Sequence, residues 1–503
     1  MPNALQRLAQ DRPADKAISA QDEFWTYESL SAKVDQVAKA FKLLGLASGD
    51  RVVLHLASTP ELVIAYQACF RIGAIATPMR TTLKGAELQP LLSRLQPSLY
   101  VGQASLYASA RDTAMDVLPL DRRFLVGDGP QNDGTRRWDD LLGLAPSGTS
   151  LGEPDLDAPA VLLTTSGTTG TPKFVAHSLR TLAATGRAQE GVGLHAGQVA
   201  LGNTPLVQAA GLFWMMGCFC LGAELVLVEQ FDADVVLDLI ERRRVTSMKG
   251  TPTMWAGLLE RQRDRPRDVA SLQACSAAGD VCAEALQRGF AETFGVALDT
   301  TWSSSECGGA FTTGSYCRPI FPAMGSEIRI VDANDAAEAQ GETGELLVKS
   351  PTLAVGYWAA PGELTALGPD GWFRTGDMMR QDDGGGLWFM SRKKELLVRG
   401  GANISPVEVE RVLTGHPAVL DAVVVGIPDL VWGERVAALV KLQPGVSAGM
   451  IGEVMTHASG QLADFKVPEH LVAVDAIPHL PSGKIDQKRA AEIAGAALSK
   501  RHH

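Results

Sequence analysis

The chain has 503 residues, which is too long for one hydrophobic core, because domains hold roughly 100–200 residues each. Hydrophobic residues make up 46% and charged residues 20% of the chain, a composition typical of globular proteins. The net charge of −11 argues against a nucleic-acid-binding protein, which needs an excess of Lys and Arg to displace counter-ions.

The N-terminal segment MPNALQRLAQDRPADK lacks an apolar core, so we expect no secretory signal. The longest apolar stretch, 211–223, is shorter than the ~20 residues that a membrane span requires. The seven cysteines are scattered and lack a zinc-ligand spacing, so we expect buried free thiols in a reducing compartment. These features predict a cytoplasmic protein, and nothing in the sequence indicates its oligomeric state.

Helical and strand-like patterns alternate through the first half of the chain. Apolar residues recur at helical spacing over 27–44, a strand-like run follows at 51–56, and a second helical pattern covers 61–72. The segment 126–159 is rich in Gly, Pro, Asp and Ser and is predicted to be a loop region, after which the alternation resumes over 160–294. Such alternation favours parallel sheets covered by helices.

The pattern changes in the second half. Short β-like runs between 327 and 397, divided by turn signals such as Asp383-Gly384-Gly385-Gly386, predict a small antiparallel or barrel-like unit. The capping-box pattern Ser405-Pro406-Val407-Glu408 predicts the start of a helix. Strand-like runs and helical patterns over 451–462 and 487–498 then predict a compact α+β unit at the C-terminus.

One segment has the composition of a phosphate-binding loop. An apolar strand at 160–164 runs into Thr165-Ser166-Gly167-Thr168-Thr169-Gly170-Thr171-Pro172-Lys173. Glycines let backbone N–H groups approach a phosphate, hydroxyls add donors, and the lysine adds charge. The Walker pattern GxxxxGK[ST] is absent. A Gly/Thr-rich loop alone is often a surface turn, but the complete string is far more specific.

This string closely resembles the phosphate loop of the adenylate-forming superfamily, which includes acyl- and aryl-CoA ligases such as the 4-coumarate and 4-chlorobenzoate enzymes, peptide-synthetase adenylation domains and firefly luciferase. The resemblance covers essentially the whole chain, because further motifs follow in the family's order. These motifs are Trp302-Ser303-Ser304-Ser305-Glu306, Phe373-Arg374-Thr375-Gly376-Asp377, Ser391-Arg392-Lys393-Lys394-Glu395, Gly400-Gly401-Ala402-Asn403-Ile404-Ser405-Pro406 and Pro481-Ser482-Gly483-Lys484.

The resemblance implies an α/β fold with two domains. A large N-terminal AMP-binding domain over 1–393 would contain doubly wound sheets to about residue 320 and the β-barrel-like unit over about 321–393. A small mobile α+β domain over 394–503 would act as a lid, with Lys394 at the hinge. The implied reaction is ATP-dependent activation of a carboxylic acid to an acyl-adenylate, followed by transfer to coenzyme A to give acyl-CoA, AMP and pyrophosphate.

The resemblance also implies a nucleotide site. Trp302 stands where the family has an adenine-stacking Tyr, and Asp377 suits the two ribose hydroxyls. Glu306 is the implied Mg²⁺ ligand, because this ion prefers carboxylate and phosphate oxygens. Taken singly, these residues would be read as a core aromatic, a turn cap and a surface carboxylate. The implied ATP- and AMP-binding residues are Thr165, Ser166, Gly167, Thr168, Thr169, Gly170, Lys173, Ala278, Gly279, Trp302, Ser303, Ser305, Asp377 and Arg392.

The implied catalytic residues are Lys484, Thr165 and Glu306. Lys484 would neutralise the charge that develops when the carboxylate meets the α-phosphorus of ATP. In the family the small domain then rotates and admits the thiol. A nucleotide-binding regulator without chemistry is disfavoured, because Lys173 and Asp377 are present together with these residues.

The sequence leaves two candidates for the thiol acceptor. Gly400 and Gly401 would line the pantetheine channel, and Lys466 would contact coenzyme A. Val467 and Glu469, however, stand where some aryl-CoA ligases have basic residues, which weakens the case for tight binding of the CoA phosphates. A carrier-protein thiol therefore stays open as the alternative acceptor.

The expected acid pocket is rich in small residues and almost uncharged. Gln208 stands where many of these ligases have His, and Phe174 replaces the glycine that usually follows the loop lysine. The sequence shows neither an Asp for an α-ammonium nor an obvious second basic group for a dicarboxylate. We therefore expect an apolar monocarboxylic acid, aryl or alkyl. The pocket residues are Gln208, Ala209, Gly211, Thr251, Met254, Ala277, Ala278, Gly279 and Ser303.

Overall fold

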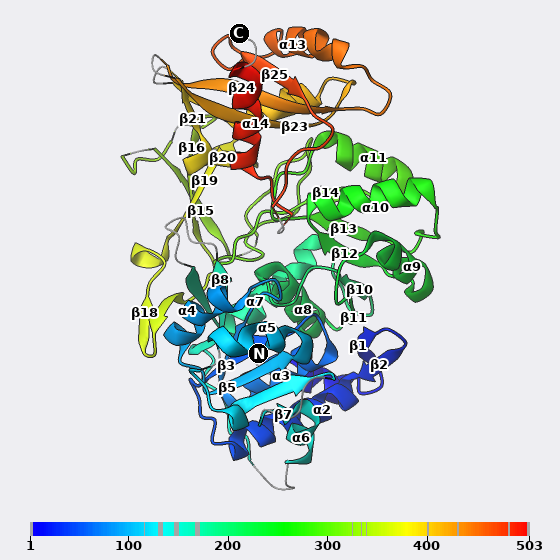
Figure 1. Ribbon diagram of the computed structural model, residues 1–503, viewed down its shortest axis with the longest axis vertical. Coiled ribbons are helices and arrows are strands. Elements are labelled where there is room, and N and C mark those ends of the chain that lie inside the picture. Colours follow the sequence, from blue (N-terminus) through cyan, green and yellow to red (C-terminus); the bar gives the residue numbers. More distant parts are fainter. Residues whose placement is uncertain are drawn as a thin grey trace.

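The computed structural model describes residues 4–114, 116–128, 134–144, 150–165, 172–323, 325–332, 334–338, 340–399, 402–429, 432–480 and 483–499. In Figure 1 the chain forms a large lower and middle part, which ends near β20 (Leu387–Arg392), and a smaller C-terminal unit above it. The mixture of several sheets and covering helices confirms the predicted α/β fold.

The largest sheet has nine strands. They are β3 (Arg51–His55), β4 (Ile75–Pro78), β5 (Leu99–Gln103), β6 (Arg123–Val126), β7 (Arg136–Arg137), β8 (Pro159–Thr165), β9 (Lys173–Ser178), β17 (Gly356–Ala360) and β18 (Glu363–Thr365). The strand order is β18-β17-β9-β8-β4-β3-β5-β6-β7, and the strands from β8 to β7 run parallel while β9, β17 and β18 pair antiparallel.

Helices cover both faces of this sheet. Along β3, Val52 and Leu54 pack in one core with α2 (Tyr27–Leu43) and α3 (Pro60–Ile72). The intervening Val53 packs in a second core with α4 (Gly85–Leu95) and α5 (Ala104–Ala114). This alternation of side chains between two buried faces is the doubly wound arrangement that the sequence predicted.

A second sheet of seven strands lies beside the first. It contains β1 (Lys16–Ala20), β2 (Glu23–Thr26), β10 (Val199–Gly202), β11 (Glu224–Leu227), β12 (Ser247–Gly250), β13 (Ala274–Ala277) and β14 (Leu298–Thr300). The order is β14-β13-β12-β10-β11-β1-β2, with only β2 antiparallel. The other helices that pack on the two sheets are α1 (Ala4–Asp11), α6 (Trp138–Gly143), α7 (Leu179–Ala188), α8 (Ala209–Leu221), α9 (Ala233–Arg243), α10 (Pro252–Asp264) and α11 (Glu284–Phe294).

Helix α8 is the apolar stretch noted in the sequence, and it is buried between the two sheets. Its residues from Gly211 to Cys220 are all buried, and most belong to the core that also holds β3 and β11 side chains. Helices α9, α10 and α11 cover the other face of the second sheet, where Met248, Trp255 and Phe290 pack together. No helix in the described part of the chain is long and apolar enough to cross a membrane.

The prediction of a loop over 126–159 was partly wrong, because β7 and α6 lie within it. The Asp140 carboxylate accepts a hydrogen bond from the Arg137 backbone N–H at 2.9 Å and caps the short helix. Trp138 and Leu141 are buried against the core and hold α6 in place. The polar composition of the segment concealed these two anchoring residues.

After the second sheet, the chain forms a four-stranded antiparallel sheet in the order β15-β16-β19-β20. Its strands other than β20 are β15 (Glu327–Val331), β16 (Thr343–Lys349) and β19 (Phe373–Gln381). The C-terminal unit contains β21 (Leu397–Arg399), β22 (Ala402–Ile404), α12 (Pro406–Thr414), β23 (Val419–Asp429), β24 (Gly433–Leu442), α13 (Ile451–Ser459), β25 (His470–Ala473) and α14 (Gln487–Ser499).

The predicted helix start is confirmed, because α12 begins at Pro406 and the Ser405 hydroxyl accepts a hydrogen bond from the Glu408 N–H at 3.2 Å. The Glu408 carboxylate is bound by Lys466, so the second hydrogen bond of a capping box is not made. All seven cysteines are free thiols. Six are buried as expected, whereas Cys317 is exposed because it lies in the turn of Ser315 and Arg318.

Candidate active site

The hairpin of β8 and β9 places the two ends of the predicted phosphate loop opposite each other. Thr165 is the last residue of β8 and pairs with Lys173, the first residue of β9. Lys173 is exposed and Thr165 is half-buried. The predicted loop residues Ser166, Gly167, Thr168, Thr169 and Gly170 lie outside the described residues.

Phe174, the residue that departs from the family pattern, packs in the core that contains α4 and α5. It is fully buried and makes an edge-to-face contact with Trp358 at a ring distance of 5.7 Å. Since side chains alternate along a strand, Lys173 and Val175 lie on the opposite face from Phe174. The substitution therefore fills a core position and leaves the face with Lys173 unchanged.

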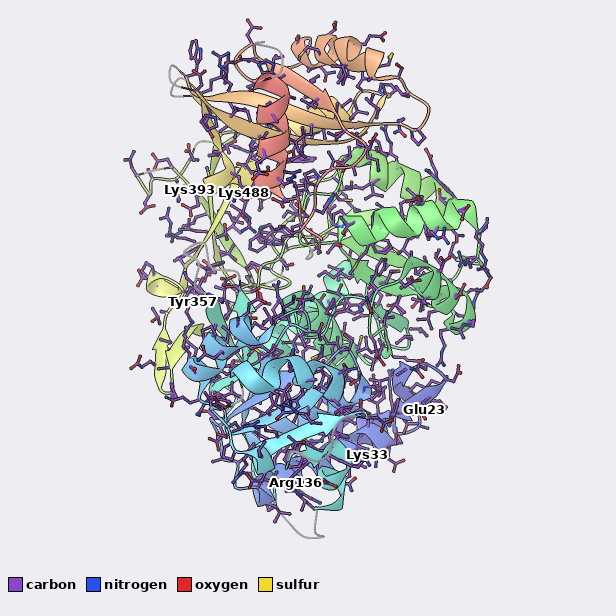
Figure 2. All side chains as sticks on the ribbon, in the orientation of Figure 1. Glu23, Lys33, Arg136, Tyr357, Lys393 and Lys488 are labelled. Carbon is purple, nitrogen blue, oxygen red and sulfur yellow. The ribbon has the colours of Figure 1, made fainter. Side chains whose placement is uncertain are left out.

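The carboxylate of Glu306 is held by a residue that the sequence did not single out. The Tyr357 hydroxyl donates a hydrogen bond to Glu306 Oε1 at 2.9 Å, and Lys173 Nζ lies 4.7 Å from the centre of the Tyr357 ring. Figure 2 labels Tyr357 on the large part of the molecule, on the strand that pairs with β9. Burial and the Glu306 charge raise the Tyr357 pKa, so its hydroxyl keeps the proton that it donates.

Glu306 is half-buried, and only its Oε1 has a hydrogen-bond partner among the described residues. Its other oxygen is available to a cation, and the residues that the structure describes contain no cluster of three or more metal-ligating side chains. A divalent ion here would have one protein carboxylate and would need oxygens from a ligand, which is the usual way in which Mg²⁺ is bound.

Asp377 lies at the centre of a second cluster of polar side chains. It is only 3% exposed, and its Oδ2 accepts a hydrogen bond from the Trp302 indole N–H at 2.7 Å. Its Oδ1 lies 3.0 Å from Arg392 Nε. Burial raises the Asp377 pKa, while Arg392, the Trp302 N–H and Lys484 oppose this shift.

Trp302 is therefore oriented by two contacts. Its N–H is bound to Asp377, and its ring meets Phe311 edge-to-face at 5.1 Å. A tyrosine at this position lacks an indole N–H, so this link between the aromatic side chain and the buried carboxylate is specific to the tryptophan.

The segment with Lys484 reaches out of the C-terminal unit and contacts the second sheet. The Ile485 backbone N–H donates to Asp280 Oδ2 at 3.3 Å, and a Cβ on Gly483 would lie 2.8 Å from Thr253 Oγ1. In Figure 1 this segment, which precedes α14, extends toward the middle part of the molecule. The contacts place Lys484 at the carboxyl ends of β12 and β13.

Lys484 shares this region with the predicted nucleotide residues. Its side chain is exposed, but desolvation by the surrounding atoms lowers its pKa, and the positive charge of Arg392 adds to that effect. Its charge also acts on Asp377. The structure thus brings Lys484, Asp377, Arg392 and Trp302 to one place, although more than a hundred residues separate the first and last of them in sequence.

The predicted acid-pocket residues lie at the carboxyl ends of β12, β13 and β14 and at the first turn of α8. Thr251 caps α10 and shares a hydrogen bond with Thr253 at 2.8 Å, and Gln208 is the N-terminal capping residue of α8. The Gln208 side chain makes no capping hydrogen bond to the helix, whereas its backbone N–H donates to the Pro205 carbonyl at 3.0 Å. Gly279 has a φ of +92°, which favours glycine there for backbone reasons.

Two predicted pocket residues have other roles. Ala277 is 1% exposed and packs in the core beneath α10 and α11. Gly211 permits a close backbone approach, since a Cβ there would lie 2.3 Å from the Pro205 carbonyl oxygen. At these two positions the small residues serve packing, a role that sequence spacing alone does not distinguish from lining a pocket.

Lys466, the predicted CoA-binding lysine, is paired within the C-terminal unit. Its Nζ lies 2.8 Å from both carboxylate oxygens of Glu408. Nearby, Glu469 is bound by Arg399 at 2.5 Å and by Arg435 at 3.2 Å. Gly400 and Gly401 lie outside the described residues, as does the side chain of the predicted hinge residue Lys394.

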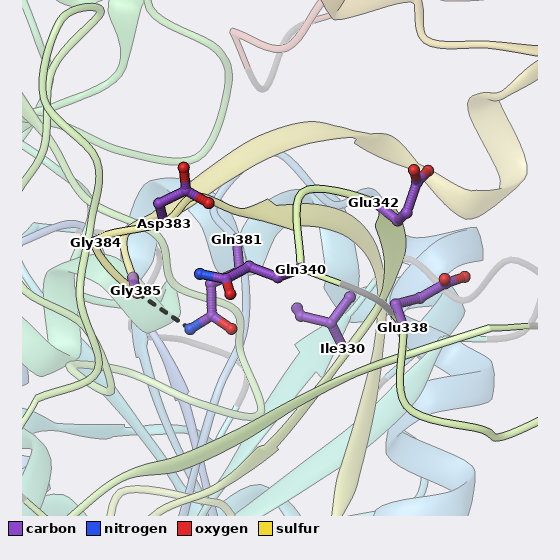
Figure 3. Close-up of a pocket in the computed structure, with 8 residues that line it drawn as sticks. All are labelled: Ile330, Glu338, Gln340, Glu342, Gln381, Asp383, Gly384 and Gly385. Atoms are coloured by element: carbon purple, nitrogen blue, oxygen red, sulfur yellow. Dashed lines mark hydrogen bonds between the residues drawn. The ribbon is translucent and has the colours of Figure 1, made fainter.

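A separate hollow of about 400 Å³ lies at the turns of the antiparallel sheet (Figure 3). It contains none of the predicted site residues, and its carboxylates give it an acidic lining that is unsuited to anionic ligands. The lining residues are Ile330, Glu338, Gln340, Glu342, Gln381, Asp383, Gly384 and Gly385.

Sequence reasoning missed Tyr357, Asp280 and Thr253. Asp280 follows directly on the predicted Gly279, and Thr253 lies between the predicted Thr251 and Met254, so proximity in sequence was an available signal for both. Tyr357 offered no such signal, because only the pairing of β17 with β9 brings it to Lys173 and Glu306.

Known proteins match the chain over almost its full length. Residues 5–358 match the AMP-binding enzyme family, and residues 408–484 match the AMP-binding enzyme C-terminal domain. An indoleacetate–CoA ligase of Aromatoleum aromaticum is 31% identical, with 96% of this chain and 95% of the relative covered.

Solved structures are similar over a comparable length. A crystal structure of an anthranilate CoA ligase in complex with anthranoyl-AMP is 25% identical, with a TM-score of 0.88 and 99% of this chain and 98% of that chain covered. An amide bond synthetase from Marinactinospora thermotolerans is 25% identical, with a TM-score of 0.84 and 98% and 99% coverage.

The Trp302–Asp377 hydrogen bond predicts the behaviour of one variant. Trp302→Phe keeps an aromatic face but removes the N–H that orients the buried carboxylate. A hydrogen bond to a charged group contributes about 1.5–3 kcal/mol, so we expect ATP binding to weaken roughly 10-fold or more, measured by calorimetry.

Trp388→Phe is the matched control, because Trp388 donates an equivalent hydrogen bond to Asp382 at 2.8 Å in the same sheet. This control should leave ATP affinity unchanged. Equal ATP affinities for Trp302→Phe and the wild type would contradict a role of the indole N–H in nucleotide binding.

Proposed function

Because this chain belongs to the AMP-binding enzyme family, we propose that it is an ATP-dependent acid–thiol ligase. It activates a carboxylic acid as an acyl-adenylate with release of pyrophosphate, and then transfers the acyl group to coenzyme A with release of AMP. The CoA ligases among its relatives support both half-reactions.

The observation that carries the proposal is the position of the Lys484 segment. Adenylation brings a carboxylate against the α-phosphate of ATP, so two anions must approach each other. The contacts of Gly483 and Ile485 with Thr253 and Asp280 hold Lys484 close to the charges of Asp377 and Arg392. Its ammonium group is thus available to neutralise the charge that develops as the acid meets the phosphate.

We assign the nucleotide to the group around Asp377. The ribose hydroxyls would donate to the Asp377 carboxylate, the adenine would lie against the Trp302 ring, and Arg392 would contact ribose or phosphate. Ala278, Gly279, Ser303 and Ser305 would border this nucleotide, as the sequence predicts. The Trp302 N–H holds the acceptor carboxylate in one orientation, which supports the assignment.

We assign the β- and γ-phosphates to the loop between Thr165 and Lys173, whose ends the hairpin holds together. Mg²⁺, if held by Glu306, would supply charge neutralisation for the phosphate oxygens. Tyr357 fixes one oxygen of Glu306 and leaves the other available, which supports this metal assignment.

We further propose that the division into an N-terminal domain, 1–393, and a lid, 394–503, allows the two half-reactions to alternate about Lys394. The Lys484 segment contacts the large domain through few residues, which supports a contact that forms for adenylation and is released for transfer.

A carrier-protein thiol is the second candidate acceptor, because the basic groups near the expected CoA surface are paired with acidic residues. Lys466 is paired with Glu408, and Arg399 and Arg435 are paired with Glu469, so these basic groups are already neutralised. This arrangement favours weak recognition of the CoA phosphates. It is equally consistent with a carrier-protein thiol as the acceptor, the alternative that the sequence left open.

The first prediction separates the half-reactions. Lys484→Ala removes a preorganised donor to the developing charge, and such losses cost about 10²–10³ in rate. Acid-dependent pyrophosphate exchange should fall by that factor, whereas thioester formation from presynthesised acyl-adenylate should change far less. Lys488→Ala, at an exposed position on α14 marked in Figure 2, is the control and should leave both assays unchanged. Equal losses of both half-reactions in Lys484→Ala, at unchanged melting temperature, would count against alternation.

The second prediction tests the docking of this segment. Gly483 has a φ of +81°, and a Cβ there would lie 2.8 Å from Thr253 Oγ1. Gly483→Ala should therefore slow exchange while sparing the transfer step. Gly445→Ala is the matched control, because Gly445 has a φ of +82° but open space around it. If both variants slow exchange equally, backbone strain and not the contact with Thr253 is responsible.

The third prediction concerns the acceptor. Because the nearby basic groups are paired internally, removal of the CoA 3′-phosphate should cost little. We expect KM values for CoA and dephospho-CoA to agree within about 3-fold, since a charge contact at an exposed site contributes about 0–1 kcal/mol. A KM for dephospho-CoA more than tenfold higher would show that this surface does bind the phosphate.

A further inference from the structure

Lys249 is a buried lysine for which neither the fold nor the proposed chemistry accounts. It is the third residue of β12, directly before Gly250 at the carboxyl end of the strand, and is only 6% exposed. Lysine is almost never buried to this degree without a partner. No residue in the described part of the chain offers it an ion pair or a side-chain hydrogen bond, and burial lowers its pKa to about 8.

The strand register decides which face Lys249 occupies. Met248 packs in the core beneath α9 and α10, whereas Ala200 of the neighbouring β10 packs in the core that contains α8. Ala200 pairs with Ser247, so Ser247 and Lys249 lie on the α8 face of the sheet. The first turns of α8 lie over the end of β10, since the Trp214 N–H donates to the Leu201 carbonyl at 3.1 Å.

A second unpaired polar group lies beside Lys249 on this face. Ser276 pairs with Lys249 across β12 and β13, is 2% exposed, and its hydroxyl lacks a hydrogen-bond partner. Buried polar groups are normally satisfied, because an unpaired one costs free energy. Unpaired polar groups at buried positions call for an explanation, and a ligand bound between Lys249 and Ser276 would supply one.

This face belongs to the predicted acid pocket. Thr251 follows Lys249 by two residues and contacts the segment with Lys484 through Thr253 and Gly483. Strands rise about 3.3 Å per residue, so Lys249 lies roughly 6–7 Å deeper than Thr251. An acid whose reacting carboxylate lies near Lys484 would place its far end toward Lys249 and Ser276.

We propose that the acid activated by this protein carries a second group with a hydrogen-bond-accepting oxygen, and that this group is first of all a carboxylate. It binds the Lys249 ammonium and the Ser276 hydroxyl at the far end of the pocket. The inference rests on the proposed function and replaces the apolar monocarboxylic acid expected from the sequence with an acid that has a second polar end. An entirely apolar acid would leave the Lys249 ammonium without a partner and would displace the water molecules that solvate it. Both effects disfavour the binding of such an acid. The rest of the acid body meets small, uncharged residues, as the sequence predicts.

The inference is tested with matched acids in the pyrophosphate exchange assay. The pairs are propanoate with malonate, butanoate with succinate, and benzoate with isophthalate; 3-hydroxybenzoate distinguishes a hydroxyl from a carboxylate acceptor. The wild type should favour the acceptor-bearing acid of at least one pair by 10-fold or more in kcat/KM. In Lys249→Met, which keeps the side-chain length and removes the charge, this preference should fall to unity or reverse.

The control variant is Lys33→Met on α2, which Figure 2 shows in the lower part of the molecule and which should keep the wild-type preference. Lys249→Met should also melt at the same or a higher temperature than the wild type, because it removes a buried unpaired charge. A folded Lys249→Met variant that keeps the wild-type preference for the acceptor-bearing acid would overturn the inference.

The remaining outcomes separate the inference from the function on which it rests. Exchange that favours the apolar acid of every pair in the wild type overturns the inference and leaves acid activation intact. Absence of exchange with every acid overturns the proposed function together with the inference. The wild-type ratios decide between these outcomes even if Lys249→Met fails to fold.

Discussion

The contact between the Lys484 segment and the second sheet is the interaction on which the proposed chemistry depends. Gly483 and Ile485 approach Thr253 and Asp280, so a lysine near the C-terminus reaches residues that lie two hundred positions earlier. Among the described residues, the contact includes one long backbone hydrogen bond and a close approach to a threonine. Such a contact is weak enough to be released, which an enzyme with two successive half-reactions requires.

Charge compensation organises the large domain around this contact. Asp377 is buried yet adjoins Arg392, the Trp302 N–H and the charge of Lys484. Glu306 is held by Tyr357, whose ring also lies against Lys173. In both groups an aromatic side chain connects an acidic residue to its surroundings, so the carboxylates are oriented before a nucleotide binds.

Paired and unpaired charges also distinguish the expected CoA surface from the proposed acid pocket. On the C-terminal unit, the basic groups near the expected CoA surface are paired with Glu408 and Glu469. In the acid pocket, by contrast, Lys249 has no partner among the described residues and lies beside the unpaired Ser276 hydroxyl. A buried unpaired charge attracts a ligand far more strongly than a paired surface charge, so selectivity is expected to lie with the acid.

The sequence alone determined the fold class and the family, because these follow from local periodicity and from strings such as the one that begins at Thr165 and ends at Lys173. It also determined the start of α12, since an N-capping serine followed by proline is a local signal. Only the tertiary structure decided which residues complete the site. Tyr357 reaches Glu306 through strand pairing, Lys466 is neutralised by Glu408, and Lys249 is buried without a partner. Burial and charge pairing depend on contacts between segments distant in sequence, so a lysine on a strand has the same local pattern whether it faces water, a carboxylate or a pocket.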